Sequence, residues 1–554
     1  MKFFAHTLIG GAVGVTCHLL LFIHHEWHLR APDLLCYHLI VIAIVGATLD
    51  KGLWMLLGYL ICLFSSIIIY RIFFHRLKHF PGPAGARITK IWHTWKLLGQ
   101  QNHLLLKSLH HQYGDFVRTG PSEITVYHPD VFMAIDGPQS NCVKAEWYDL
   151  LSPNQSLVTA RTKRLHGARR RQWNRGFTSQ ALDQYQSRLI PLIDQLERCI
   201  DGDITAEKAS EMTDLLYWIG FDRMGDFIFS RTFNMLSRQK WHHVIVLLQR
   251  ALSLLGPLSP LPWFLHLCFK LFPRIWILKD WFQMVSWCEM RLTERLDCVE
   301  NIPKALDVAH YLLEDARENP HQFPWLTGDS ILAIVAGSEP IAAVLVGLFC
   351  EIYQEVERVD ISDGARSLGS SCPHLEGAIL EALRLYPALP TGGNRKTLKN
   401  GITIGGTFIP PETTIVAPRF CISRREDCFE QAHTFLPERW YKTPRMIRNK
   451  AAFSPFGTGK YSRPSFSDWN FDLFDLQGHT SCLGRTLAMN DMRLITARLV
   501  RRYRFSVPDG ETMESVWRDL KDQFTSNPGR LRLFFELRED CIVKSKLADD
   551  IKPG

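Results

Sequence analysis

The chain has 554 residues, of which 46% are hydrophobic, and carries a formal net charge of +8 with an isoelectric point near 8.8. That length allows two to four ordinary domains or one large catalytic unit. The mild positive charge, without a dense Lys/Arg run, argues against a nucleic-acid partner and suits an anionic membrane surface or an acidic protein. The 14 cysteines lack the spacing of a disulfide framework or a paired metal site, so we expect reduced thiols in a cytosol-facing protein.

Three apolar stretches stand at the N-terminus, at residues 7–23, 34–49 and 53–70. The third is uncharged and long enough to cross a bilayer, while the first two are marginal in length and each contains a His. Basic residues crowd positions 71–78, and the positive-inside tendency puts that end and everything after it on the cytosolic side. We expect residues 1–79 to be a membrane anchor with one to three spans, rather than a cleaved signal peptide or buried core helices.

A Pro/Gly segment separates this anchor from the rest of the chain. Residues 80–87 begin Phe-Pro-Gly-Pro-Ala-Gly, and because proline fixes φ and blocks helix continuation, we expect a stiff, non-helical joint before a globular part at 88–554. Short strand-like runs come first, apolar residues then recur at helical spacing from 166 to 383, and strand-like residues return at 402–416. The pattern predicts a mainly helical domain with small β-sheets and without alternating βαβ units.

Individual elements can be placed within this domain. A helix is expected at 182–200, with Pro191 kinking or breaking it. A long apolar helix is expected at 330–350. The last helix should run over 485–502 and be followed by a strand at 531–537.

The most informative residue is Cys482, in Ser-Cys-Leu-Gly-Arg. Phe456 opens the run Phe-Gly-Thr-Gly-Lys-Tyr-Ser, which includes Gly459 and has the pattern of the first half of F-x-x-G-x-x-x-C-x-G. The second half, with Cys482 and Gly484, follows only after 19 more residues, 463–481. Without them the run closely resembles the haem-binding loop of cytochromes P-450. Glycines let such a loop turn tightly and aim N–H groups at a thiolate, which a following helix N-terminus stabilises.

The resemblance implies specific roles for this loop. Cys482 would be the axial thiolate ligand of the haem iron, and Phe456, Gly459 and Gly484 would belong to the loop that holds the haem. Tyr461 departs from the family, because it stands where a propionate-binding Arg is usual.

A second landmark is Glu381-Ala-Leu-Arg384, whose side chains share one helix face. Alone it would be an ordinary surface ion pair. In the resembled family, E-x-x-R joins the Arg of a P-E-R-W segment, here Arg439, in a buried structural triad. Arg439 and Cys482 are 43 positions apart, and removing the 19 extra residues leaves the roughly two dozen usual in the family.

Haem propionates have three candidate partners. His166 and Arg170 lie one helical turn apart in a stretch that resembles the propionate-binding helix of the family, and Arg is suited to bidentate contact with carboxylates. Arg395 resembles a further propionate partner. A solvated basic helix face is the alternative interpretation of His166 and Arg170.

The fourth landmark is Ala-Gly-Ser-Glu-Pro-Ile at 336–341, which resembles the A-G-x-D/E-T-T stretch lining the oxygen site. There, a carboxylate and a Thr hydroxyl deliver protons. Glu339 keeps the acid, but Pro340 replaces the hydroxyl residue and Ser338 is a displaced donor. Substrate hydroxyls or ordered water would then have to substitute, or the chemistry would not activate dioxygen.

The 19-residue insertion, 463–481, is aromatic and acidic, unlike its neighbours. One hypothesis is translated intron sequence, because excision restores the motif, although no codon choice puts a standard GT and AG at the two ends of this cut. The other is a genuine exposed loop, since long insertions cost little when exposed. Transcript sequencing distinguishes the two.

Taken together, the resemblance implies a membrane-anchored cytochrome P-450 fold of fungal type, with haem b as its cofactor. It implies a mono-oxygenase that acts on a small lipophilic, secondary-metabolite-like substrate with O₂ and electrons from an NADPH-dependent reductase. The expected location is the endoplasmic reticulum membrane, with the catalytic domain facing the cytosol. The alternatives are a haem-thiolate isomerase or dehydratase, and a catalytically inactive copy or gene-model artefact.

Overall fold

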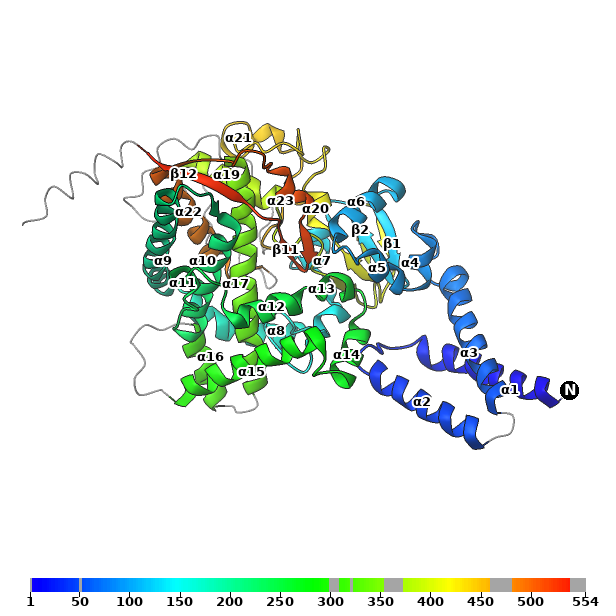
Figure 1. The fold of residues 1–554 in the computed structure, drawn as a ribbon. Coiled ribbons are helices and arrows are strands. Elements are labelled where there is room, and N and C mark those ends of the chain that lie inside the picture. Colours follow the sequence, from blue (N-terminus) through cyan, green and yellow to red (C-terminus); the bar gives the residue numbers. More distant parts are fainter. Residues whose placement is uncertain are drawn as a thin grey trace, which may run out of the picture.

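The computed structural model describes residues 2–48, 52–297, 308–318, 322–352, 372–458 and 481–538. Three N-terminal helices project from a large and mostly helical body, and a small sheet lies on the side of the body nearest to them (Figure 1). The prediction of a mainly helical fold with small β-sheets is confirmed.

The projecting region contains three apolar helices. Its elements are α1 (Lys2–Cys17), η1 (His18–Phe22), α2 (Ala31–Thr48), α3 (Gly52–Ile69) and η2 (Tyr70–Phe74). Phe4–Phe22 and Gly52–Phe74 are long and apolar enough to cross a membrane, whereas the apolar part of α2, Ala31–Ala47, is shorter. These helices coincide, within a few residues, with the three apolar stretches of the sequence. The expectation of a non-helical joint at 80–87 is wrong in its second half, because the helix α4 (Ala84–Ile88) begins directly after Pro83. Proline interrupts a helix that precedes it but allows a new one to begin after it.

Glycines bring α1 and α3 into close backbone contact. A Cβ added to Gly10 would lie 1.9 Å from the carbonyl oxygen of Met55, and one added to Gly58 would lie 2.2 Å from that of Thr7. No larger side chain fits there, so the two helices approach as membrane helices with small interface residues do. Many of their large apolar side chains are exposed, such as Leu53 of α3 at 73%.

The five-stranded sheet packs next to the anchor end of the body. Its spatial order is β1 (Phe116–Gly120), β2 (Glu123–Val126), β8 (Thr414–Val416), β5 (Arg395–Thr397) and β3 (Cys142–Lys144). Strands β2 and β8 are parallel, with Ile124 opposite Ile415, and the other pairs are antiparallel. The other strands form small sheets: β4 (Ser210–Glu211), β12 (Arg532–Leu537) and β9 (Tyr503–Ser506); β6 (Ile402–Ile404) and β7 (Thr407–Ile409); β10 (Lys521–Gln523) and β11 (Thr525–Asn527).

Helices make up the remainder of the body. The first half contains α4 (Ala84–Ile88), α5 (Ile91–Lys96), α6 (Asn102–Tyr113), α7 (Val131–Asp136), η3 (Glu146–Asp149), α8 (Lys163–Asn174), η4 (Arg175–Phe177), α9 (Ser179–Thr205), α10 (Met212–Phe229), α11 (Met235–Arg238), α12 (His243–Leu252), α13 (Leu255–Leu258) and α14 (Pro262–Leu271). The second half contains α15 (Trp276–Asp297), α16 (Val308–Glu318), α17 (Phe323–Glu351), α19 (Pro373–Leu385), α20 (Arg419–Ile422), α21 (Glu438–Tyr441), η8 (Pro444–Met446), η9 (Lys450–Ala452), α22 (Arg485–Arg502) and α23 (Glu514–Arg518).

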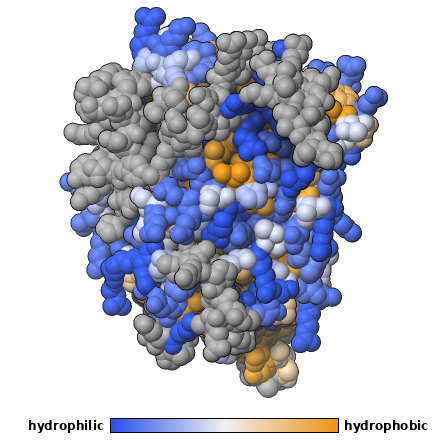
Figure 2. Space-filling view, turned by 90° about the vertical axis from the view of Figure 1, so that its left-hand side faces the viewer, coloured by the Kyte–Doolittle hydropathy of each residue, from blue (hydrophilic) through white to orange (hydrophobic). Residues whose placement is uncertain are grey.

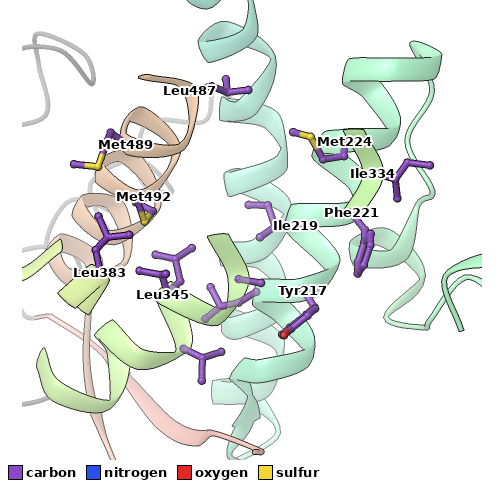
Figure 3. Packing of buried hydrophobic residues seen from close by; sticks show 14 of the residues in the cluster. Tyr217, Ile219, Phe221, Met224, Ile334, Leu345, Leu383, Leu487, Met489 and Met492 are labelled. Atoms are coloured by element: carbon purple, nitrogen blue, oxygen red, sulfur yellow. The ribbon is translucent and has the colours of Figure 1, made fainter. Parts of the chain in front are cut away.

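Helix α17 is the centre of this body. It is apolar and long enough to span a membrane, but 72% of its apolar window is buried inside the protein, so it is a core helix. Helix α10 runs along it, and α22 packs nearby (Figure 3). Phe221 of α10, Leu345 of α17 and Met492 of α22 are buried in this common core. On the face of the molecule opposite the anchor, the described residues are mostly hydrophilic (Figure 2).

Two prolines lie inside helices without ending them. Pro191 lies within α9, which continues on both sides, so of the two expected outcomes, a kink or a break, the break is wrong. Pro191 is exposed, and solvent can satisfy the carbonyl group that loses its donor. Pro340 likewise lies inside α17. That helix begins at Phe323, before the predicted residue 330, because Pro324 is tolerated in a first helical turn.

Candidate active site

The two halves of the interrupted cysteine motif meet in space. The backbone N–H of Cys482 donates to the carbonyl oxygen of Phe456 over 2.8 Å. Gly457 has a φ of +79°, a conformation that favours glycine, so the chain turns sharply beside this bond. Gly459 and residues 463–480 lie outside the described part of the chain. The described residues therefore bring Phe456 and Cys482 together as an uninterrupted motif would.

Cys482 stands at the beginning of α22. Gly484 is the N-cap of that helix, and the N–H groups of Gly484 and Arg485 point at the sulfur. Surrounding protein atoms desolvate the sulfur and raise the pKa of the thiol, while these N–H groups and the charges of Arg170 and Arg485 act in the opposite direction. Helix N-termini and adjacent cations are the usual means of stabilising a thiolate.

Helix α8 carries Arg170 to the same loop. Arg170 is buried, and its Nη1 donates to the carbonyl oxygen of Ser481 over 2.7 Å. His166 lies one turn earlier on α8 and is half-buried. Of the two, Arg170 is brought beside Cys482. Binding of haem propionates by His166 and Arg170 stays a prediction.

Arg395 is held in a different wall of the body. Its Nε donates to Oδ1 of Asp136 over 2.6 Å, and its Nη1 donates to the hydroxyl of Tyr148 over 2.7 Å. The side chain is 9% exposed, and Tyr148 also lines the cavity described below. Its proposed contact with a propionate stays a prediction.

Glu381, Arg384 and Arg439 form one buried cluster. Arg384 makes a bidentate pair with Glu381, at 2.9 and 2.7 Å, because the two lie three residues apart on α19. Arg439 donates from Nε to Glu381 over 2.9 Å, and Trp440 donates from its indole over 2.8 Å. All three charged residues have 0% exposure. The remaining N–H groups of Arg384 reach main-chain carbonyls, among them Ala432 at 2.7 Å.

Glu339 is buried on α17. Burial raises the pKa of its carboxyl group to about 7, and a hydrogen bond from Thr525 acts in the opposite direction. Ser338, the displaced hydroxyl considered from the sequence, donates back to the carbonyl of Ile334 within the same helix. Ser338 therefore does not take the place of the missing hydroxyl at Pro340.

An apolar cavity lies next to α17 and reaches the β10–β11 hairpin. Its lining includes Trp147, Leu255, Trp281, Leu332, Val335 and Phe524. Trp147 and Phe524 stack with ring centroids 4.4 Å apart. Such an apolar, mostly aromatic and aliphatic lining suits a lipophilic small molecule. None of these residues was a sequence candidate, because they come from distant segments without a shared motif.

The residues present fit a haem. Among the described cysteines, Cys482 is the exposed one, whereas the others are buried or half-buried. Ala336, in the middle of α17, is also exposed, although Ile334 and Ser338 beside it are buried. A thiolate-ligated haem requires a thiol with N–H donors aimed at its sulfur, which Cys482 provides. It also requires open space beside a core helix, and the exposed Ala336 marks such a space on α17.

The site thus fits a haem held by a thiolate, and comparison with known sequences identifies the family of the chain. A profile of the cytochrome P-450 family matches residues 81–462, and the chain belongs to that family. The match ends immediately before the insertion at 463–481. As predicted, the family is that of the haem-thiolate mono-oxygenases.

Curated relatives agree with this assignment. The chain is 30% identical to cytochrome P-450 monooxygenase notG' of Aspergillus versicolor, over 95% of this chain and 96% of the relative. It is 30% identical to tryprostatin B 6-hydroxylase of Aspergillus fumigatus, over 93% of both chains. It is 32% identical to cytochrome P-450 monooxygenase orf5 of Eupenicillium brefeldianum, over 87% of this chain and 95% of the relative. The protein is therefore a mono-oxygenase that uses a haem cofactor.

Proposed function

We propose that this protein hydroxylates or otherwise oxidises a small lipophilic secondary metabolite, with electrons supplied by an NADPH-dependent flavoprotein reductase. The observation that carries the proposal is the hydrogen bond between Cys482 and Phe456, because it rejoins the haem loop across the insertion. The overall reaction is R–H + O₂ + 2e⁻ + 2H⁺ → R–OH + H₂O. It therefore needs a route for electrons, a route for two protons and a dry site for the substrate.

Each requirement has candidate residues. Cys482 would ligate the iron of haem b, and His166, Arg170 and Arg395 would hold its propionates. The haem supplies dioxygen binding and the insertion of one oxygen atom into the substrate. Glu339, with a pKa near 7, would hold and release a proton at its carboxyl oxygens.

The substrate class is proposed from the cavity. Its lining is almost wholly apolar, with few polar side chains such as Asn154 and Thr159, so a lipophilic molecule with one or two polar groups fits best. One curated relative is named a tryprostatin B hydroxylase, which supports a lipophilic natural product as the substrate here.

Reconstitution with a reductase tests the proposed function. The full chain would be combined with a fungal NADPH–cytochrome reductase in lipid vesicles, with tryprostatin B as the first probe. We expect O₂ uptake and probe oxidation that require NADPH and the reductase. Conversion of substrates without NADPH would contradict the proposal and favour the isomerase or dehydratase, and a preparation without any haem-dependent conversion would favour the inactive copy.

We further propose that the anchor crosses the endoplasmic reticulum membrane three times, with the catalytic domain in the cytosol. The loop between η1 and α2 supports this, because it binds the catalytic domain. Glu26 accepts hydrogen bonds from Arg161, at 2.8 and 3.0 Å, and from Lys396 at 2.7 Å. His28 contacts Asp149 at 2.9 Å. A loop held by ion pairs to the cytosolic domain must itself lie in the cytosol.

Cysteine accessibility in sealed microsomes measures this topology. We expect His25→Cys, at an exposed position of the loop, to react with a membrane-impermeant thiol reagent, because the loop faces the cytosol. We expect Asp50→Cys, between the second and third apolar segments, to react only after the membrane is permeabilised. The wild-type chain is the control, because it measures how far the native cysteines react with the reagent. Protection of His25→Cys would contradict three spans.

A further inference from the structure

A hydrogen bond joins two distant parts of the chain beside the cavity. Thr525 of β11 donates from Oγ1 to Oε2 of Glu339 on α17 over 2.6 Å. Glu339 is 6% exposed and Thr525 is 4% exposed. The residues are 186 positions apart, so no local motif links them.

We propose that Thr525 is a positioning residue for proton delivery, because its hydroxyl holds the Glu339 carboxyl group in place. Residue 340 cannot supply such a hydroxyl, because it is a proline. The inference rests on the proposed mono-oxygenase function and adds to it a residue from outside the α17 motif.

The position of Glu339 relative to the cavity supports this role. Leu332 and Val335 of α17 line the cavity, and Glu339 follows Val335 by four residues. Residues four apart share a helix face, so Glu339 lies about 6 Å further along the same face. Phe524, next to Thr525, lines the cavity from the hairpin side. The carboxyl–hydroxyl pair therefore lies at the cavity end where α17 and the hairpin meet.

Contacts other than the Thr525 hydroxyl fix the hairpin. Asp522 accepts a hydrogen bond from Thr391 over 2.6 Å, and the backbone N–H of Ser526 donates to the carbonyl oxygen of Ala388 over 2.9 Å. Phe524 is the single residue between Gln523 and Thr525, which pair with each other, so the chain reverses at this position. Its φ is +81°, a costly conformation for an aromatic residue. These contacts hold the tip of the β10–β11 hairpin in place, so the hydroxyl of Thr525 is free of a structural role and can donate to Glu339.

The surroundings of Glu339 suit a group that exchanges protons. Burial raises its pKa to about 7, and the hydrogen bond from Thr525 limits that rise. Among the described residues, the phenol of Tyr217 on α10 is also affected, because the charge of Glu339 contributes to the raised pKa of that phenol. A carboxyl group with a pKa near 7 is populated in both forms at neutral pH, as general acid–base catalysis requires.

Infrared titration of the full-length chain in detergent tests the inference. The protonated-carboxyl band of Glu339, assigned by its loss in Glu339→Gln, would be followed against pH in Thr525→Val, Thr525→Ser and Ser526→Ala. Valine keeps the shape of threonine and removes the hydroxyl, so we expect the titration midpoint of Glu339 to rise by about one pH unit. Serine keeps the donor and should restore the wild-type midpoint. Ser526→Ala is the matched control, because it removes a neighbouring hydroxyl that bonds elsewhere.

A second readout links the bond to catalysis. In the reconstituted system, we expect Thr525→Val to release more of the NADPH electrons as hydrogen peroxide instead of oxidised product, and Thr525→Ser to restore the coupling. An unchanged infrared midpoint in Thr525→Val would overturn the inference, and a raised midpoint with unchanged coupling would reduce Thr525 to a structural contact. Absence of turnover in the wild type would instead overturn the proposed function, while the infrared midpoints still decide whether Thr525 acts on Glu339.

Discussion

Replacing Glu381 by alanine is expected to cost about 3–5 kcal/mol of folding free energy. The substitution leaves the guanidinium groups of Arg384 and Arg439, both with 0% exposure, without their shared carboxylate. It also removes the acceptor of the Trp440 indole. Since domains are stable by only about 5–15 kcal/mol, we expect a large fall in melting temperature and poor haem incorporation. Thermal unfolding of the purified full chain, followed by tryptophan fluorescence, measures the effect.

An exposed ion pair supplies the control for this variant. Glu314 contacts Arg175 at 2.7 Å, and both side chains are 46% exposed. Exposed pairs contribute less than about 1 kcal/mol, so Glu314→Ala should melt close to the wild type. Equal melting temperatures for Glu381→Ala and Glu314→Ala would show that the buried cluster does not stabilise the fold as its geometry indicates.

Replacing Cys482 by alanine is expected to abolish mono-oxygenase turnover. The reduced, CO-bound protein should lose the Soret band that gives the family its name, because no thiolate remains on the iron. The side chain is exposed, so its loss leaves no core cavity and the fold should persist. Cys268→Ala, at a half-buried cysteine on α14, is the control and should keep both band and turnover. Retention of the band in Cys482→Ala would assign the axial ligand to another residue.

The local motifs could be recognised in the sequence because each is specified by close neighbours. The pair of Glu381 and Arg384 follows from their spacing on one helix, and α22 begins and ends where its apolar pattern predicts. Arg439 could be added only through the family resemblance. The structure then shows which main-chain carbonyls complete the cluster, which no spacing rule provides.

Contacts between distant segments could not be predicted. Thr525 reaches Glu339, and Glu26 reaches Arg161 and Lys396, across separations that depend on the complete fold. The sequence shows the missing hydroxyl at Pro340 but not the element that supplies another one. Burial of a polar group without a hydrogen-bond partner costs free energy, so buried polar groups are paired. Which partner each group has depends on the packing of the complete fold.

The insertion also illustrates the limit of pattern recognition. Arg463–Ser481 separates the two halves of the haem loop in the sequence, and the family match ends at Ser462. The hydrogen bond between Phe456 and Cys482 is nevertheless present. This contact supports an active chain.

The reduced, CO-bound absorption spectrum of the full-length wild-type chain tests the central claim most directly, measured beside a variant that lacks residues 463–481. Excision leaves Ser462 before Cys482, so both proteins carry Ser-Cys-Leu-Gly-Arg. Because the backbone of Cys482 already forms a hydrogen bond with Phe456 in the complete chain, we predict the thiolate-type Soret band in both proteins. A band in the shortened variant alone would contradict ligation by Cys482 in the chain as it stands.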